Sequence, residues 1–244
     1  MLFRVVRAEN RKLNRSALWI VFFVVPLISA VYGTFNYTQN LGVLTREWYS
    51  LWTQHTLFYD TFFFAPMIAV YAAYLWRLEH LGHNWNLILS APVRPFCLYF
   101  AKFVTTAKMA FLTQVWVYAL FILCGRLWAN LPGWPPAQIP LWLLRGFAGG
   151  LAVIALQCLL SMVIRSFAVP VLIALCGGIV GMLLLSKDAG MYWPYALMIL
   201  GMNANRTEDM ISDGLLPFLL SCAVFIVLFC CAAVTIMTTR DVKT

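Results

Sequence analysis

Six long apolar stretches constrain the fold of this chain more than any other feature. They cover roughly residues 17–36, 56–76, 98–124, 141–164, 167–186 and 214–238. A helix needs about 20 apolar residues to cross the hydrocarbon core of a bilayer. The sequence therefore predicts an all-α integral membrane bundle of about six transmembrane helices, with residues 1–244 forming a single transmembrane domain.

The composition excludes an ordinary water-soluble domain. Of the 244 residues, 63% are hydrophobic and 11% are charged, whereas a soluble domain is roughly half apolar and about a quarter charged. A soluble fold of this length cannot hide so much apolar surface from water. The formal net charge of +8 would suggest nucleic acid for a soluble protein. Here the basic residues lie at the ends of apolar runs, where membrane orientation explains them better, and no nucleic-acid partner is expected.

The basic residues also predict the orientation. If the N-terminus is cytoplasmic, the inside segments hold Arg4, Arg7, Arg11, Lys12, Arg15, Arg77, Arg94, Lys102, Arg165, Arg240 and Lys243. The outside segments hold Arg46, Arg126, Lys187 and Arg206. Cytoplasmic loops carry an excess of Lys and Arg, so this distribution predicts that both termini are cytoplasmic.

Residues 1–16 form a candidate interfacial helix before the first span. At about 100° per residue, Arg4, Arg7, Arg11 and Arg15 fall on one helix face. The opposite face carries Leu2, Val6 and Leu13, with Phe3 beside them. Such a helix lies along the cytoplasmic leaflet with its bases facing anionic lipid. The simpler alternative is a basic tail that only sets topology.

A seventh apolar stretch, residues 191–202, is too short to cross the membrane comfortably. It contains Pro194 and Gly201. These features predict a short re-entrant or interfacial segment.

No catalytic or cofactor site is expected on this chain. The phosphate-binding pattern G-x-x-x-x-G-K-[ST] and the nucleophile elbow G-x-S-x-G do not occur, so any ATP must be bound by another chain. His80 and His83 share a helix face but lack a plausible third metal ligand. The seven cysteines contain no C-x-x-C spacing, and no metal site is predicted.

Aromatic and acidic residues gather at the predicted outer side. The aromatic set is Trp48, Trp52, Trp128, Trp134, Trp142, Trp193, Tyr49, Tyr59, Tyr192 and Tyr195. It is read either as an interfacial belt or as a surface that holds an amphipathic ligand. Asp60 is the one acid within a predicted span, about one turn in from the outer face. It either has a functional role or reaches interfacial water.

The loop at residues 77–97, between the second and third spans, is predicted to be cytoplasmic. It mixes apolar Leu81, Trp85, Leu87, Ile88 and Leu89 with polar Asn84, Asn86 and Ser90. Pro92 and Pro95 end any helix before the third span. This pattern is typical of a short helix that docks into a groove on a cytoplasmic partner. An amphipathic linker on the membrane surface is the alternative.

Several segments resemble the small type-2 ABC exporter permeases, and among them the lantibiotic-immunity permeases. The similar segments are Ala8–Leu13, Trp48–His55, Tyr74–His80, Asn84–Val93, the turn Arg165-Ser166 and the ending Thr239–Val242. The resemblance covers nearly the whole chain.

The resemblance implies a multi-pass protein of the bacterial cytoplasmic membrane with several partners. Two permease chains, the same or related, pair with two copies of a separate ATPase that carries ATP and Mg. The loop after the second span then acts as the coupling helix, with the ATPase contact set His80, His83, Trp85, Asn86, Leu87, Ile88, Ser90 and Pro92. The implied cargo is an amphipathic antimicrobial peptide expelled from the membrane.

Candidate cargo contacts follow from that implication together with the outer aromatic and acidic residues. They are Trp48, Trp52, Asp60, Trp193, Glu208, Asp209 and Asp213. Export of another hydrophobic drug or lipid-like molecule stays open, as does a membrane scaffold. A membrane enzyme also stays open, although Glu79, His80 and His83 are its only candidate catalytic groups.

Overall fold

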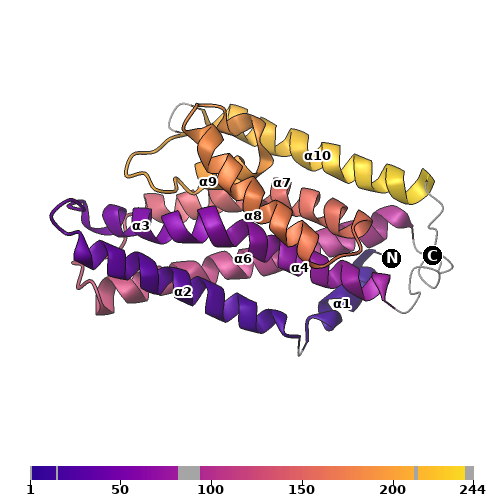
Figure 1. Cartoon of the computed structure of the whole chain (residues 1–244), viewed down its shortest axis with the longest axis horizontal. Coiled ribbons are helices and arrows are strands. Elements are labelled where there is room, and N and C mark those ends of the chain that lie inside the picture. Colours follow the sequence, from indigo (N-terminus) through magenta and orange to yellow (C-terminus); the bar gives the residue numbers. More distant parts are fainter. Residues whose placement is uncertain (1, 15, 82–93, 212–213, 240–244) are drawn as a thin grey trace.

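The computed structural model describes residues 2–14, 16–81, 94–211 and 214–239, and these are almost entirely helical (Figure 1). The α-helices are α1 Leu2–Lys12, α2 Leu18–Gln39, α3 Glu47–Phe58, α4 Ala65–His80, α6 Pro95–Leu127, α7 Gln138–Val163, α8 Ala168–Leu185, α9 Pro194–Gly201 and α10 Leu215–Thr239. A π-helical segment, Tyr59–Phe64, joins α3 to α4, and a 3₁₀ turn, Gly190–Tyr192, precedes α9. No strand occurs within the described ranges.

Within the part of the chain that the structure describes, six helices are long and apolar enough to cross a membrane, which confirms the expected bundle. They are Leu18–Gln39, Glu47–His80, Pro95–Leu127, Gln138–Val163, Ala168–Leu185 and Leu215–Thr239. The second differs from expectation, because it begins at Glu47 rather than near residue 56. Its first turns carry Gln54, His55 and Thr56, whose side chains are buried inside the bundle. These polar residues weaken the apolar signal without ending the helix.

Helix α9 lies inside the bundle. All eight of its residues are buried, and it packs against α7 and α8. A Cβ atom at Gly149 of α7 would lie 2.4 Å from the carbonyl oxygen of Leu197, so this crossing requires glycine. Residues 194–201, the helical part of the stretch at 191–202, are therefore enclosed by neighbouring helices.

Helix α1 forms as expected but is docked on protein. It packs against α6 beside the end of α4 (Figure 1). Its inward face carries Glu9, and Leu13 follows directly after the helix; each is 2% exposed. Arg4, Arg7 and Arg11 are exposed on the opposite face. The helix is therefore part of the bundle rather than a segment resting on lipid alone.

Candidate functional site

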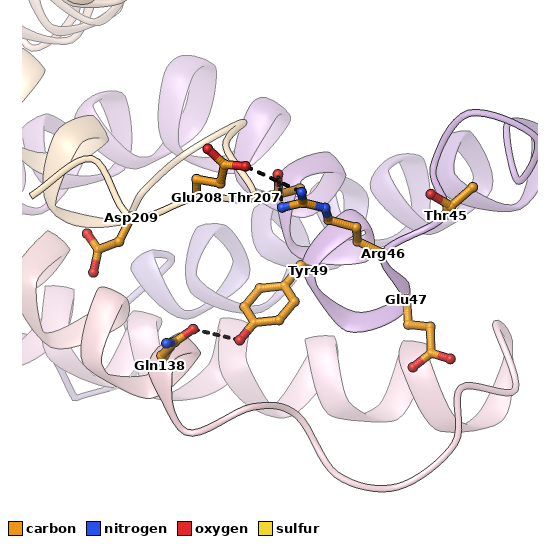
Figure 2. A pocket seen from close by; sticks show the side chains of 8 residues that line it. All are labelled: Thr45, Arg46, Glu47, Tyr49, Gln138, Thr207, Glu208 and Asp209. Carbon is orange, nitrogen blue, oxygen red and sulfur yellow. Dashed lines mark hydrogen bonds and ion pairs between the residues drawn. The ribbon is translucent and has the colours of Figure 1, made fainter. Parts of the chain in front are cut away.

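A pocket of about 560 Å³ lies at the end of the bundle opposite α1, where α3 and α7 begin. We call it the outer pocket; it is lined by Thr45, Arg46, Glu47, Tyr49, Gln138, Thr207, Glu208 and Asp209 (Figure 2). Arg46 Nη2 lies 3.3 Å from Glu208 Oε1, and both side chains are largely exposed, by 56% and 83%. The hydroxyl of Tyr49 donates to Gln138 Oε1 at 2.6 Å. Such an exposed ion pair is weak, so Glu208 can exchange Arg46 for another cation.

Asp209, by contrast, is held by the fold. Both of its carboxylate oxygens accept from Arg145 Nη1 at 2.8 Å, Trp142 Nε1 donates at 3.1 Å, and the amide of Ile211 donates at 3.0 Å. Burial raises the pKa of Asp209, but these hydrogen bonds from Ile211, Arg145 and Trp142 outweigh it, so the pKa lies below its ordinary value. Glu208 and Asp209, adjacent in sequence, thus differ in role.

Three of the six outer tryptophans, Trp48, Trp52 and Trp142, are core residues, which corrects the expectation of a ligand-facing surface at Trp48 and Trp52. These two side chains are 3% and 0% exposed. Trp48 Nε1 donates to Pro132 O at 2.8 Å, and Trp52 Nε1 donates to Met202 O at 3.0 Å. Because α3 is an inner helix, its two indoles stabilise the packing of the segments that contain Pro132 and Met202. Trp193 is half-buried and donates to Gly177 O at 2.9 Å.

Asp60 lies deep in the bundle rather than near the outer face. It belongs to the π-helical segment, thirteen positions beyond Glu47 and hence about 20 Å along the helix axis. The residue is 0% exposed, and neither carboxylate oxygen has a hydrogen-bond partner in the described part of the chain. Single π-helical turns inside α-helices are frequent at functional sites, and an intramembrane acid is expected to have a function.

An apolar groove of about 470 Å³ opens beside the same π-helical segment. It is lined by Phe62, Phe63, Pro66, Phe167, Ala168, Val171, Leu172 and Leu175. Close packing joins its two walls, since a Cβ atom at Gly178 of α8 would lie 2.7 Å from Thr61 O. Asp60 does not line the groove, but it lies two residues before Phe62, which does, on the π-helical segment that packs against α8.

Four charged side chains meet at the opposite end. We call Glu9, Lys12, Glu79 and Lys102 the charge cluster. Lys102 Nζ lies 3.0 Å from Glu9 Oε2 and 2.7 Å from Glu79 Oε1. Lys12 Nζ lies 2.6 Å from Glu9 Oε1 and 2.5 Å from Glu79 Oε1. The two acids and two bases alternate in a closed ring that joins α1, α4 and α6.

Glu9, Glu79 and Lys102 of the charge cluster are buried, Lys12 is partly buried, and each of the four has partners of opposite charge. Lys102 is 0% exposed and also donates to Leu75 O at 2.9 Å, so its three N–H bonds have three acceptors. Burial lowers the pKa of Lys12, but attraction to Glu9 and hydrogen bonds with Glu79 and Glu9 outweigh burial and raise it above the ordinary value. Lys12 therefore stays charged at neutral pH.

A family model described as "ABC-2 family transporter protein" matches residues 5–181. The chain belongs to the ABC-2 transporter family. It is the membrane-spanning permease of an ABC exporter, which works with an ABC ATPase. No curated protein and no solved structure matches it.

Much of the permease's expected ATPase contact lies outside the described residues. This holds for His83, Trp85, Asn86, Leu87, Ile88, Ser90 and Pro92, and also for the cargo candidate Asp213. His80 is described, and its Nε2 lies 3.0 Å from Ser161 O. Within the described ranges, no three His, Cys, Asp or Glu side chains come together as metal ligands.

Sequence reasoning missed the charge cluster and the apolar groove of the permease. Lys102 and Lys12 counted only as topogenic charges. Glu9 offered one signal, because it falls on the face of the N-terminal helix opposite its arginines. The groove offered none, because its walls are ordinary apolar residues far apart in sequence.

Proposed function

We propose that this permease expels a cationic amphipathic antimicrobial peptide from the bacterial cytoplasmic membrane, with two copies of a separate ATPase and a second permease, the same or related. The observation that carries the proposal is Asp60, a buried carboxyl group without a partner among the described residues, two residues before Phe62 of the apolar groove. A cationic amphipath needs apolar contact and a counter-charge in one place. Burying a carboxyl group without a partner is costly. A cation that reaches Asp60 would supply that partner, so its binding there is favourable.

The apolar groove accounts for the lateral entry of such a cargo. A membrane-bound peptide reaches a groove at the side of the bundle without crossing a wide aqueous pore. Phe62 and Phe63 continue the chain from Asp60, so a small separation of α8 from the π-helical segment would expose the acid to a cargo held in the groove. We expect ATP binding to drive this separation.

The outer pocket accounts for release. Glu47 and Glu208 are exposed there, and they offer cations a polar exit once the cargo leaves the groove. Asp209 takes part in holding the loop rather than in binding cargo, because Arg145 and Trp142 already occupy its oxygens. Among the acids of this loop, Glu208 is therefore the cargo contact we favour.

The proposal is tested by producing the permease with its ATPase and measuring protection of cells against a cationic peptide. Asp60→Asn keeps the shape and removes the charge, and we expect at least a tenfold loss of protection, with Asp60→Glu retaining more. Asp188→Asn is the matched control, because Asp188 is exposed and its φ of 56° suits Asn equally well.

The outcomes separate the cargo classes. Full protection by a normally assembled Asp60→Asn complex would exclude a charged contact at this site. If Val171→Trp, which fills the groove, then abolished export of a neutral amphipath, a drug-like or lipid-like cargo would replace the peptide. Loss of protection in both Asp60→Asn and the Asp188→Asn control would mean that charge removal acts non-specifically.

Coupling is tested separately. The resemblance implies that residues 80–92 contact the ATPase, with Trp85, Leu87 and Ile88 as anchors. We expect a stoichiometric ATP-binding protein to copurify with the tagged chain in mild detergent and to be lost on Trp85→Asp. Retention of the ATPase by this variant would place the contact elsewhere.

A further inference from the structure

Helix α1 carries a face that nothing in the described chain occupies. Arg4, Arg7 and Arg11 are exposed on one side, which we call the arginine face, and none of them makes an ion pair or hydrogen bond with described residues. At about 100° per residue this face points directly away from Glu9. Phe3, at its flank, is 79% exposed.

The arginine face is held close to the start of a membrane span. Only residues 13–17 separate α1 from α2, and Trp19 Nε1 donates to Leu13 O at 3.1 Å, which links the residue after α1 to the first turn of α2. Asn10 is also hydrogen-bonded to Lys108 of α6. The arginines therefore lie near the level of lipid headgroups, at the end predicted to be cytoplasmic.

We propose that α1 makes the exporter responsive to anionic phospholipid. In this proposal the arginine face binds anionic headgroups, and Glu9 relays the position of α1 through Lys102 and Glu79 to the helix ends that flank residues 82–93. Lys102 and Glu9 are thus positioning residues. The relay rests on the proposed coupling role of residues 80–92, but it does not depend on the cargo.

Chemistry favours lipid as the occupant of the arginine face. The three arginines are spread over eight residues, or seven helical steps, which is about 10 Å along the axis, and an exposed phenylalanine flanks them. A basic stripe with an apolar flank is typical of helices that bind anionic interfaces. Each basic residue near an anionic leaflet strengthens binding about fivefold, so three of them make α1 sensitive to the lipid composition.

Because the charge cluster is largely buried, α1 is coupled closely to the ends of α4 and α6. Glu9 and Lys102 are 2% and 0% exposed, and moving α1 alone would leave buried charges without partners, which is strongly unfavourable. Glu79 lies two residues before the last described residue of that segment, Leu81, and Lys102 lies in the second turn of α6. A shift of α1 is therefore accompanied by a shift of both helix ends.

The test uses the complete exporter, permease with ATPase, in vesicles of phosphatidylcholine with or without about a third phosphatidylglycerol. We expect the anionic vesicles to raise basal ATP hydrolysis severalfold. Arg4→Gln, Arg7→Gln and Arg11→Gln together should abolish this response. Arg126→Gln, Lys187→Gln and Arg206→Gln together remove the same charge from the opposite end and should leave it unchanged.

A second variant tests the relay itself. Glu9→Gln with Lys102→Gln keeps hydrogen-bonding groups in place. It removes one charge of each sign, and with them three of the four ion pairs, so that only Lys12 and Glu79 remain paired. We expect normal assembly and normal binding of the variant's cytoplasmic end to anionic lipid, but no lipid response of ATP hydrolysis. A wild-type lipid response in this variant would overturn the relay.

Other results would overturn the proposed lipid response or separate it from the cargo and coupling proposals. An unchanged lipid response after loss of the arginine face would overturn the proposal. Failure of that variant to retain its ATPase in neutral vesicles would show a protein interface instead, which also overturns it. If the cargo assignment alone is wrong, the basal lipid response persists; if residues 80–92 do not couple, Trp85→Asp leaves hydrolysis intact in both lipids.

Discussion

Lys102 and Asp60 are both completely buried in predicted spans, yet their surroundings are opposite. Lys102 has three acceptors and closes a ring of alternating charges. Asp60 has no partner in the described part of the chain. A buried charge whose partners are all present holds helices together. A buried acid without any partner contributes little to holding the resting structure, and this contrast separates the part of the permease that transmits movement from the part that binds cargo.

The largest expected effect comes from removing Lys102, the buried charge whose hydrogen-bond partners are all present. Lys102→Ala leaves Glu9 and Glu79 buried with Lys12 as their only shared partner, so we expect a loss of about 3–5 kcal/mol in unfolding free energy. Thermal unfolding in detergent measures it. Lys108→Ala, an exposed lysine of the same helix, should cost well under half as much; equal losses would mean that the cluster is not special.

The same measurement on Asp60 should give the opposite result. Asp60→Asn removes no existing hydrogen bond, so we expect unfolding stability to stay within about 1 kcal/mol of wild type while peptide protection falls. A large loss of stability would show that Asp60 has a structural partner and would weaken the contrast with Lys102.

An intermediate effect is expected where packing rather than charge holds the bundle. Gly149→Ala places a methyl group against the backbone of α9, and overpacking of this kind costs about 1–3 kcal/mol. Gly42→Ala is the control, because no atom lies within 4 Å of the added Cβ position. Equal unfolding temperatures for the two variants would contradict the tight α7–α9 crossing.

The smallest effect concerns pH. Because the pKa of Asp209 is lowered by folding, its contribution is fully present above the ordinary pKa of 3.8 and is lost as pH falls through the lower folded value. We expect wild type to exceed Asp209→Asn by about 1 kcal/mol or less at pH 7, with the difference vanishing under strong acid. A difference that grows on acidification would contradict the sign of the shift.

The sequence predicted the parts of the fold that depend on local composition. The six apolar runs, the amphipathic α1 and the short α9 were all recognisable, because length and periodicity set what a bilayer accepts. The start of the second span was misjudged, since polar Gln54, His55 and Thr56 face inward and conceal an otherwise continuous helix.

The site was less predictable, because it depends on which side chains meet. A tryptophan near the end of a span is equally consistent with an interfacial aromatic belt and with the protein core. Only the packing of the helices shows that Trp48 and Trp52 lie in the core. The charge cluster joins residues as far apart as Glu9 and Lys102, whose pairing no local pattern contains. Asp60 was recognisable as an intramembrane acid, but its depth in the bundle could be predicted only if the start of its helix at Glu47 was known.

The enclosed position of α9 has a consequence for biogenesis. Its eight residues are too few to span a bilayer, and they gain their burial from α7, α8 and the cluster that Phe218 and Cys222 of α10 complete. During synthesis α9 emerges after α7 and α8 but before α10. A chain arrested before Leu215 would therefore hold a complete α9 that lacks its cover from α10, so the final packing of α9 depends on synthesis of the last span.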